Sequence, residues 1–389
     1  MNVNSPHSTN SVLHPHLTAK DSAMNVNSPR SPRSHIGRLS LLALAMGGTL
    51  AALALAGPLT PPAGPVTSTH KTLTEVEPRI PINLTNTPGD ADSLFKITQP
   101  GSYYLTGNIT GVPARHGIEI AVAVNGPSVT IDLMGYELAG VAGSLDGISV
   151  TVFSTRNVAI RNGTVRAWDG DGVDVLNSAN NLLDGLRVEG NGGRGISAGT
   201  ASTVTGCTAV FNAGGGIFAE GGSTVTGCTA SSNEGDGISA GSGSTVAGCT
   251  SFFNFGNGIF ASSSSTVTGC TASFNNGDGI EVFSNCRVTD NTCAFNGNGG
   301  NGAGIYATGS DNRIEGNNCT GADRGIDVDA AGNIIIRNTC SGNSIDWVIA
   351  ANNVVGPILD RRAPASAAIN GFSAPSSLGS TDPNANFSY

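Results

Sequence analysis

The chain has 389 residues, of which 12% are charged and 55 are Gly, and its formal net charge is −9. From residue 57 onward there are 27 acidic and 15 basic side chains, so a basic face for nucleic-acid phosphates or an anionic membrane is excluded. His116 is the only His between residues 93 and 356. A multi-His zinc site and a Ser-His-Asp triad are therefore disfavoured.

Residues 1–56 are predicted to form an N-terminal extension that ends in a secretory signal. An uncharged apolar run at 39–56 follows three Arg residues, and Ala54-Leu55-Ala56 fits the small-x-small cleavage pattern. The alternative is an uncleaved membrane anchor, for which this run is short. The sequence MNVNSP begins at both Met1 and Met24, so either methionine is a possible start of translation.

Residues 57–92 are rich in Pro, Thr and Gly and are predicted to be a linker. From about Phe95, short alternating β-branched segments separated by Gly, Pro or Asn predict strands. This pattern continues to residue 356. Residues 357–389 are rich in Ala, Ser and Pro, which predicts a loose cap or an extended tail.

A repeat of 21 residues dominates the middle of the chain. Its copies align on pairs of Gly and Ile that begin at Gly195, Gly216, Gly237, Gly258 and Gly279. A fixed period of this length predicts a solenoid, in which each unit buries its apolar face against its neighbours. We therefore expect an all-β, single-stranded parallel β-helix over 93–356. The further Gly-Ile or Gly-Val pairs bring it to about ten coils, and they begin at Gly117, Gly147, Gly172, Gly304 and Gly325.

The strand after each Gly alternates between apolar and variable residues, so its outward positions can be assigned. The first outward position of successive coils is occupied by Ser149, Asp174, Ser197, Phe218, Ser239, Phe260, Glu281, Tyr306 and Asp327. A second outward position two residues later contains Asp329 in the last of these coils.

Two other columns are predicted to be structural. One contains an Asn in every coil from Asn191 to Asn296, which suits hydrogen bonding between stacked turns. The other contains Cys207, Cys228, Cys249 and Cys270, with Leu186 in the preceding coil, so it is expected to face the core. For the eight Cys residues, disulfides and a buried thiol ladder both remain open, and Cys286 fits neither Cys column.

The repeat unit is a Gly-Ile strand, then Val or Ile, then Asn or Cys, then Asn-x-Gly. It resembles the right-handed parallel β-helix repeats of the pectin-lyase-like group, of the carbohydrate-binding and sugar-hydrolase type. The segments ITQPGSYYLTGNI at 97–109 and VTIDLMGYELAG at 129–140 resemble the first coils of secreted bacterial members. The resemblance covers about 93–356 and implies the fold; the group includes lyases, hydrolases, epimerases and adhesins.

Candidate catalytic residues lie among the outward carboxylates. Asp327 and Asp329 are two residues apart on one strand face, so their Cα atoms are expected about 6.5–7 Å apart, near the spacing of an inverting glycosidase. Glu281 lies two coils away, and Tyr306 between them could stack on a sugar. Asp174 is a further candidate on the same face. Solvated acidic decoration is the alternative for all four carboxylates.

Lyase chemistry and Ca²⁺ binding are less well supported by the sequence. A lyase needs a cationic base, yet no Lys follows Lys96, and Arg194, Arg287 and Arg324 are expected at turns. The Gly-Asp-Gly segments at 235–237 and 277–279 suit turns better than Ca²⁺ sites. Phe218 and Phe260 are expected to be exposed and to favour adhesion or ligand binding, or packing of the linker or tail, over ionic chemistry.

The sequence therefore predicts an exported β-helix protein, secreted, periplasmic or on the cell surface, with a binding or structural role toward carbohydrate or the cell envelope. The alternative is a polysaccharide hydrolase or lyase that uses the acidic outward face. No metal site and no cofactor are predicted, although Ca²⁺ is conceivable for a lyase. The expected partner is a polysaccharide or a cell-surface component, with no nucleic acid and no membrane span after signal cleavage.

Overall fold

The computed structural model describes residues 77–122, 128–297, 300–360 and 382–389, all within the compact unit Lys71–Tyr389. The predicted signal sequence and the alternative start sites lie outside the described residues. Every regular element in the described segments is a β-strand. No helix that is long and apolar enough to cross a membrane occurs there.

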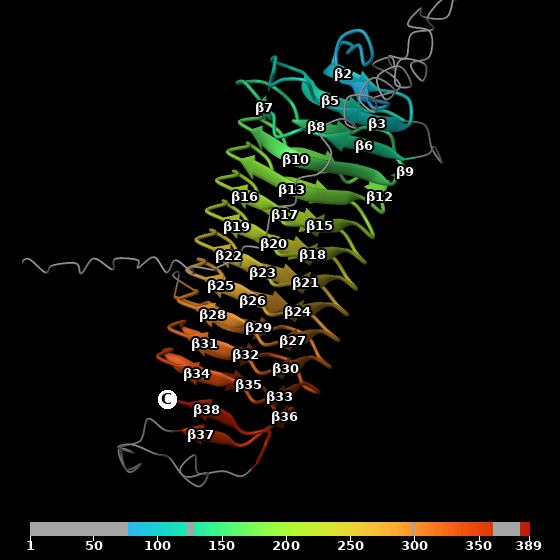
Figure 1. Cartoon of the computed structure of the whole chain (residues 1–389). Helices are drawn as coiled ribbons and strands as arrows, with labels where there is room; N and C mark the ends of the chain where they lie inside the picture. The colour runs from blue at the N-terminus through green and yellow to red at the C-terminus, as the bar shows by residue number, and fades with distance from the viewer. Residues whose placement is uncertain (1–76, 123–127, 298–299, 361–381) are drawn as a thin grey trace, which may run out of the picture. The chain divides into compact units, whose positions relative to one another are not determined.

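One face of the solenoid is a parallel sheet of 12 strands, to which each coil contributes one strand (Figure 1). Consecutive members are hydrogen-bonded neighbours. In order they are β2 (Ser93–Ile97), β5 (His116–Ile120), β8 (Ile148–Val150), β11 (Val173–Val175), β14 (Ile196–Ala198), β17 (Ile217–Ala219), β20 (Ile238–Ala240), β23 (Ile259–Ala261), β26 (Ile280–Val282), β29 (Ala303–Ala307), β32 (Arg324–Val328) and β35 (Ile345–Ile349).

The remaining faces form a sheet of 24 strands, to which a regular coil contributes two short strands joined by a bend. Its first members are β1 (Ile80–Pro81), β3 (Gly101–Tyr104), β4 (Ile109–Thr110), β6 (Val129–Asp132), β7 (Glu137–Ala139), β10 (Val158–Arg166) and β13 (Leu182–Glu189). The regular coils add β15 (Thr203–Thr205), β16 (Thr208–Val210), β18 (Thr224–Thr226), β19 (Thr229–Ser231), β21 (Thr245–Ala247), β22 (Thr250–Phe252), β24 (Thr266–Thr268), β25 (Thr271–Ser273), β27 (Arg287–Thr289) and β28 (Thr292–Ala294). The last members are β30 (Arg313–Glu315), β31 (Asn318–Thr320), β33 (Ile334–Ile336), β34 (Thr339–Ser341), β36 (Val354–Val355), β37 (Ile358–Asp360) and β38 (Asn386–Ser388). A separate pair consists of β9 (Thr155–Arg156) and β12 (Ser178–Ala179).

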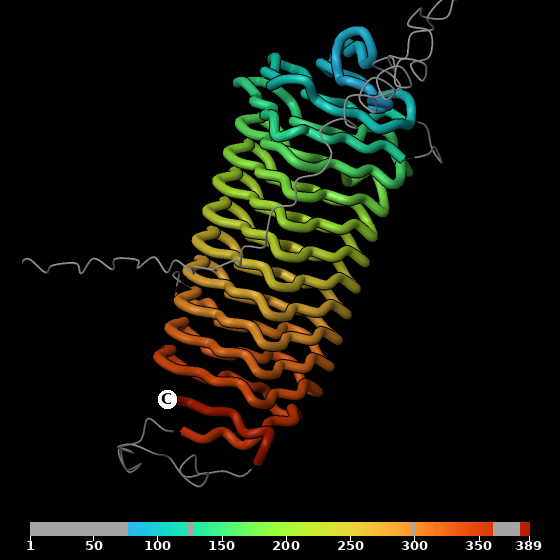
Figure 2. Tube along the Cα trace, in the orientation of Figure 1, coloured from blue at the N-terminus to red at the C-terminus, as the bar shows by residue number. Residues whose placement is uncertain are grey.

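The strands stack coil on coil along the chain, as the tube trace shows (Figure 2). The prediction of an all-β parallel solenoid with a repeat near 21 residues is confirmed, but the number of turns is about 13 and not about ten. The count from Gly-Ile pairs was low because the coils at either end lack that pair. Strands β1, β37 and β38 also extend the solenoid beyond the expected limits of 93–356.

The core is a column of medium-sized apolar side chains. The Ile residues of β17, β20 and β23 stack in register and are fully buried, as are the Val residues of β18 and β21. Each such side chain contributes about 1.5–3 kcal/mol when buried. Thr-Val-Thr segments form strands because β-branched residues pack well on a pleated surface. Glycines in the left-handed region, such as Gly206 and Gly227, join the two short strands of each regular coil.

The Asn column is a continuous hydrogen-bonded ladder inside the turns. Asn275 Oδ1 accepts hydrogen bonds from the backbone N–H and the side-chain amide of Asn254, at 3.1 and 3.0 Å. Its own amide donates to Asn296 Oδ1 at 2.9 Å and to the Ser251 carbonyl at 3.2 Å. All of these Asn side chains are buried, so the ladder satisfies groups that water cannot reach.

All eight Cys residues are buried and free, which answers the question that the sequence left open. In the Cys207 column each thiol lies near backbone carbonyls; the Cys228 sulfur is 3.3 Å from the Thr226 oxygen. Cys286, which fitted neither Cys column, belongs to a third column of Ser and Asn. Its backbone N–H donates to Asn312 Oδ1 at 2.7 Å.

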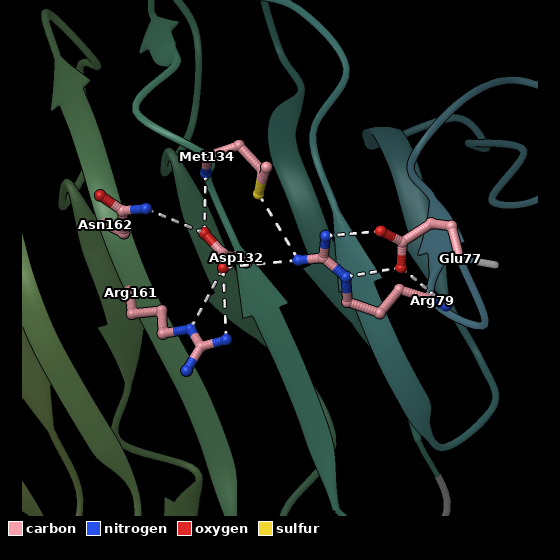
Figure 3. Close-up of polar contacts among 6 residues, drawn as sticks. All are labelled: Glu77, Arg79, Asp132, Met134, Arg161 and Asn162. Atoms are coloured by element: carbon pink, nitrogen blue, oxygen red, sulfur yellow. Dashed lines mark hydrogen bonds and ion pairs between the residues drawn. The ribbon is translucent and has the colours of Figure 1, made fainter. Parts of the chain in front are cut away.

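The first coils are tied together on the 24-stranded sheet by a charged network around Asp132 (Figure 3). The Asp132 carboxylate accepts hydrogen bonds from the Met134 backbone N–H at 2.9 Å and from the Asn162 amide at 3.2 Å. It also forms ion pairs with Arg79 and Arg161 at 3.5 and 3.3 Å. The network links β6, β10 and the residues preceding β1, and so attaches the first strand to the stack.

We expect Asn275→Ala to lower the free energy of unfolding by about 2–3 kcal/mol, because it leaves buried donors of Asn254 without an acceptor. Urea denaturation followed by circular dichroism measures this change. The matched control is Asn276→Ala, since Asn276 is the next residue and is exposed. Equal effects of the two substitutions would contradict a stabilising role for the ladder.

We also expect the unreduced, denatured protein to react with eight equivalents of an alkylating reagent, as counted by mass spectrometry. Adding a reductant should leave the unfolding midpoint unchanged, because the fold contains no cross-link between the eight sulfurs. A mass deficit of two labels, or a midpoint that falls on reduction, would disprove the thiol ladder.

Candidate functional site

Four of the predicted site residues come together on the outward face of the 12-stranded sheet. Glu281 on β26 pairs in register with Tyr306 on β29, which pairs with Asp327 on β32. Asp329 directly follows β32, and its carboxylate accepts a 2.6 Å hydrogen bond from the Tyr306 hydroxyl. We call these four residues, together with Asp278 and Arg324 described below, the acidic site.

The phenol of Tyr306 is held by Asp329. The hydrogen bond to that carboxylate, together with partial burial, raises the pKa of Tyr306 to about 12. The phenol therefore stays neutral at physiological pH and keeps its ring in place on the face of the sheet. Tyr306 is half-buried and Asp329 is exposed, so both can reach a ligand.

Asp327 differs from the expectation of an exposed carboxylate, because its side chain is fully buried. It forms an ion pair with Arg324 at 2.5 Å, and the Arg324 guanidinium also lies 5.9 Å from the centre of the Tyr306 ring. Burial raises the pKa of Asp327 above its ordinary value, while Arg324 opposes the rise. Arg324 was expected at a turn, but β32 begins at Arg324, which directs its side chain to this face; Arg287 likewise begins β27.

A column of polar side chains at the turns runs beside the outward positions, and from the sequence only its two members in Gly-Asp-Gly segments were assigned to turns. We call it the turn-carboxylate column; it includes Asp146, Asp171, Asp236, Asn257 and Asp278. Each member accepts a hydrogen bond from the backbone N–H of the next coil, at 2.6–2.8 Å. One oxygen of each side chain is thus used to attach the next coil, as a turn residue would be.

The second carboxylate oxygen of the column is used differently from coil to coil. At Asp236 it accepts a 2.9 Å hydrogen bond from Ser239, three residues later on β20. At Asp278 the residue three positions later is Glu281, which offers a second carboxylate in place of a hydroxyl. Burial raises the pKa of Asp278 to about 6, and the negative charge of Glu281 adds to the rise.

Glu281 is oriented from the preceding coil. Its Oε2 accepts a 2.6 Å hydrogen bond from the side-chain amide of Asn257, and burial raises its pKa above the ordinary value. Asp278 also lines a cavity of about 200 Å³ together with Asn276, Gly277, Asn301 and Gly302. The acidic site therefore combines three carboxyl groups with raised pKa, an aromatic ring and an arginine.

Asp174 is not part of this site. It lies on β11, five coils from β26 and so about 24 Å away. Burial raises the pKa of Asp174 to about 6. Nearby, the Asp146 carboxylate lies 3.3 Å from His116 Nδ1 and raises the pKa of His116, although burial opposes this. This group forms a second polar region near the first coils.

The two phenylalanines predicted to bind lie on the expected face but are half-buried. The guanidinium of Arg194 covers the Phe218 ring at 4.5 Å. Phe260 is in register with Glu281 on the neighbouring strand. The expectation of an exposed Phe column at these two positions is therefore wrong. The exposed phenylalanines of the described segments lie elsewhere, between strands, and are Phe153, Phe211, Phe253, Phe255, Phe274, Phe283 and Phe295.

Asp90, Asp92 and Glu119 form a group of carboxylates close enough to share a metal ion in the described part of the chain. The Lys96 ammonium stands among them, 2.6 Å from Asp90 and 2.9 Å from Glu119. A cation is thus already supplied by the chain. Two carboxylates of this group are paired with the Lys96 ammonium, so the group does not indicate a Ca²⁺ site.

The comparisons agree with this architecture. A family model described as right handed beta helix region matches residues 141–251 and 238–318. The chain is similar to this family over residues 141–318, and its fold is that of a right-handed parallel β-helix. A search of curated protein sequences gives no match.

Two solved structures are similar over most of their length. They are the A-modules of the Azotobacter vinelandii mannuronan C-5 epimerases AlgE6 and AlgE4. The first has a TM-score of 0.60 at 17% identity and covers 69% of this chain and 86% of that module. The second has a TM-score of 0.58 at 17% identity and covers 71% of this chain and 90% of that module. At this identity the similarity concerns the fold.

The raised pKa of Asp278 predicts a pH-dependent stability difference between the native protein and Asp278→Asn. The neutral acid is favoured in the fold, so its stabilising contribution is present below about pH 4 and is lost as the pH rises through 6. The variant, with a permanently neutral amide, should gain up to about 2–3 kcal/mol relative to the native protein between pH 4 and 7. Urea denaturation across this range measures the difference, and a flat difference would contradict the assignment.

Proposed function

We propose that this protein is exported and binds a polysaccharide on the outward face of β26, β29 and β32. The observation that carries the proposal is the placement of the Tyr306 ring between carboxylates of the neighbouring strands. A sugar presents an apolar C–H face and hydroxyl donors, and this site offers an aromatic ring beside hydrogen-bond acceptors. The apolar run and cleavage pattern before residue 57 support export.

The charge of the acidic site favours a neutral polysaccharide or one that carries amino groups. The positive charge of Arg324 is already offset by Asp327, which leaves Glu281, Asp329 and the partly ionised Asp278 as net negative charge. The carboxylates of a polyuronate would meet like charges at short range. The epimerase modules of similar fold are named for mannuronan. We propose that this protein also binds a polysaccharide, but one whose sugars are neutral or carry amino groups.

A second candidate function, glycoside hydrolysis, is favoured by the pair Asp278 and Glu281. A carboxyl group with a pKa of about 6 is suited to act as a general acid near neutral pH. Asp278 would protonate the glycosidic oxygen as the C–O bond breaks. Glu281 would take a proton from the water that adds to the sugar carbon, so that one water is consumed for each bond cleaved.

The test is a binding and turnover screen against neutral glucans and xylans, chitosan, alginate and polygalacturonate. We expect affinity for a neutral or amino-sugar polymer, measured by calorimetry, and a loss of about tenfold or more in Tyr306→Ala, which corresponds to about 1.4 kcal/mol. If hydrolysis occurs, reducing ends should appear with the native protein and be lost in Asp278→Asn. Asn keeps an oxygen for the Ala303 N–H, so the turn is preserved.

The matched control is Asp171→Asn, which alters the same turn-carboxylate column five coils earlier, where Asp171 accepts hydrogen bonds from the Arg194 N–H and the Ser197 hydroxyl. It should leave affinity unchanged. Binding only to alginate or polygalacturonate would disprove the charge argument, and no binding to any polymer would disprove the proposed function. If a polymer binds but no new reducing ends form, the binding function stands and hydrolysis of that polymer is excluded.

A further inference from the structure

A second set of aromatic side chains lies at the turn that follows the second short strand of each regular coil. It consists of Phe211, Phe253, Phe274 and Phe295, separated once by Ser232. All five residues have φ between 55° and 57°, in the left-handed region. Large side chains rarely adopt this conformation, because it is strained for residues with a Cβ.

The turn itself does not need phenylalanine. Ser232 adopts the same backbone conformation in the same column, so a small polar residue satisfies the turn. The four Phe side chains are exposed by 45–69%, so they recover only part of the free energy that burial would provide. Strained and exposed aromatic residues of this kind point to a role outside the core.

Three of the rings stack along the solenoid. The ring centres of Phe253 and Phe274 are 5.1 Å apart, and those of Phe274 and Phe295 are 5.0 Å apart. Beyond Phe295 the column continues with Gly321, where a Cβ would approach the Phe295 ring to 2.5 Å. The faces of the middle ring are thus covered, and the three rings present their edges as a continuous apolar strip.

This strip forms one wall of a groove of about 580 Å³, within the ~300–1,000 Å³ that is usual for small-ligand sites. The groove also contains the polar side chains of Asn276, Asp323 and Ser344. Asp323 uses Oδ2 to accept a 3.1 Å hydrogen bond from the Gly302 N–H. Among the described residues no donor contacts its Oδ1, which can therefore accept from a ligand, so the groove is apolar on one side and polar on the other.

The groove adjoins the cavity that Asp278 of the acidic site lines. Asn276 lines both this groove and the smaller cavity that contains Asp278. Gly277, and Gly302 of the next coil, line this smaller cavity beside Asn276 and have no side chain that would narrow it. A chain-like ligand that occupies the acidic site can therefore extend around the turn without leaving the surface.

We propose that the groove along Phe253, Phe274 and Phe295 is an additional subsite for the same polysaccharide, in a proposal that rests on the function proposed above. The C–H groups of a pyranose ring pack against the ring edges, and its hydroxyls donate to Asp323 and Asn276. An acyl chain would leave the polar wall unsatisfied. The sugar matches both walls of the groove.

The test compares ligand lengths in the double variant Phe274→Ser/Phe295→Ser. The probes are a disaccharide and a hexasaccharide of the polymer that binds best in the screen. The disaccharide is expected to bind only at the acidic site, and the hexasaccharide at both. We expect the double variant to bind the hexasaccharide about tenfold more weakly, as measured by calorimetry, and the disaccharide with unchanged affinity.

The control is Phe211→Ser, which removes an exposed Phe of the same column and backbone conformation outside the groove. It should change neither affinity, and Ser232 shows that the turn tolerates serine. If the double variant binds both ligands as the native protein does, while Tyr306→Ala weakens both, the subsite is wrong and the proposed function stands. If the native protein binds neither ligand, both proposals fail. An equal loss of affinity for the disaccharide in the double variant would also overturn the subsite, because the effect would then not depend on the length of the ligand.

Discussion

The vertical stacking of identical coils is the constraint on which this structure depends. Parallel strands lie about 4.8 Å apart, so every side chain has its counterpart from the next coil as a direct neighbour. Columns of Ile, Val and Cys suit this arrangement, because identical apolar side chains pack against each other. The Asn column suits it because its side chains donate hydrogen bonds to the Asn of the next coil. A column of carboxylates does not, because like charges at this spacing repel. In the first outward column, the acidic residues Asp174, Glu281 and Asp327 are consequently separated from one another by Ser, Phe or Tyr.

This rule explains how the acidic site differs from the coils before it. Asp236 and Asp278 hold the next coil in the same way, yet only Asp278 faces a glutamate in place of a serine. The replacement of Ser239 by Glu281 in the corresponding position converts a satisfied turn into a pair of acids. Tyr306 then separates Glu281 from Asp327, and Arg324 offsets the charge of Asp327. The arrangement concentrates negative charge where the repeat would otherwise exclude it.

Much of the fold follows from the sequence, because a 21-residue period and alternating strands specify which residues share a column. The order from Glu281 through Tyr306 to Asp327 could be predicted on that basis. The burial of Asp327 could not, since it depends on Arg324 starting β32 and folding back over its own strand. Asp278 was overlooked because its Gly-Asp-Gly turn is the same as the one at Asp236. The signal that could have identified it is the difference three residues later.

The four nearly identical coils between β14 and β23 separate the polar region around His116 and Asp174 from the acidic site. Each coil adds the same rise, so the distance between the two regions can change only in whole steps of one repeat. Gain or loss of a coil during evolution would alter the separation of the two regions while leaving the contacts within each unchanged. The repeat thus allows the reach of the surface to vary independently of its chemistry.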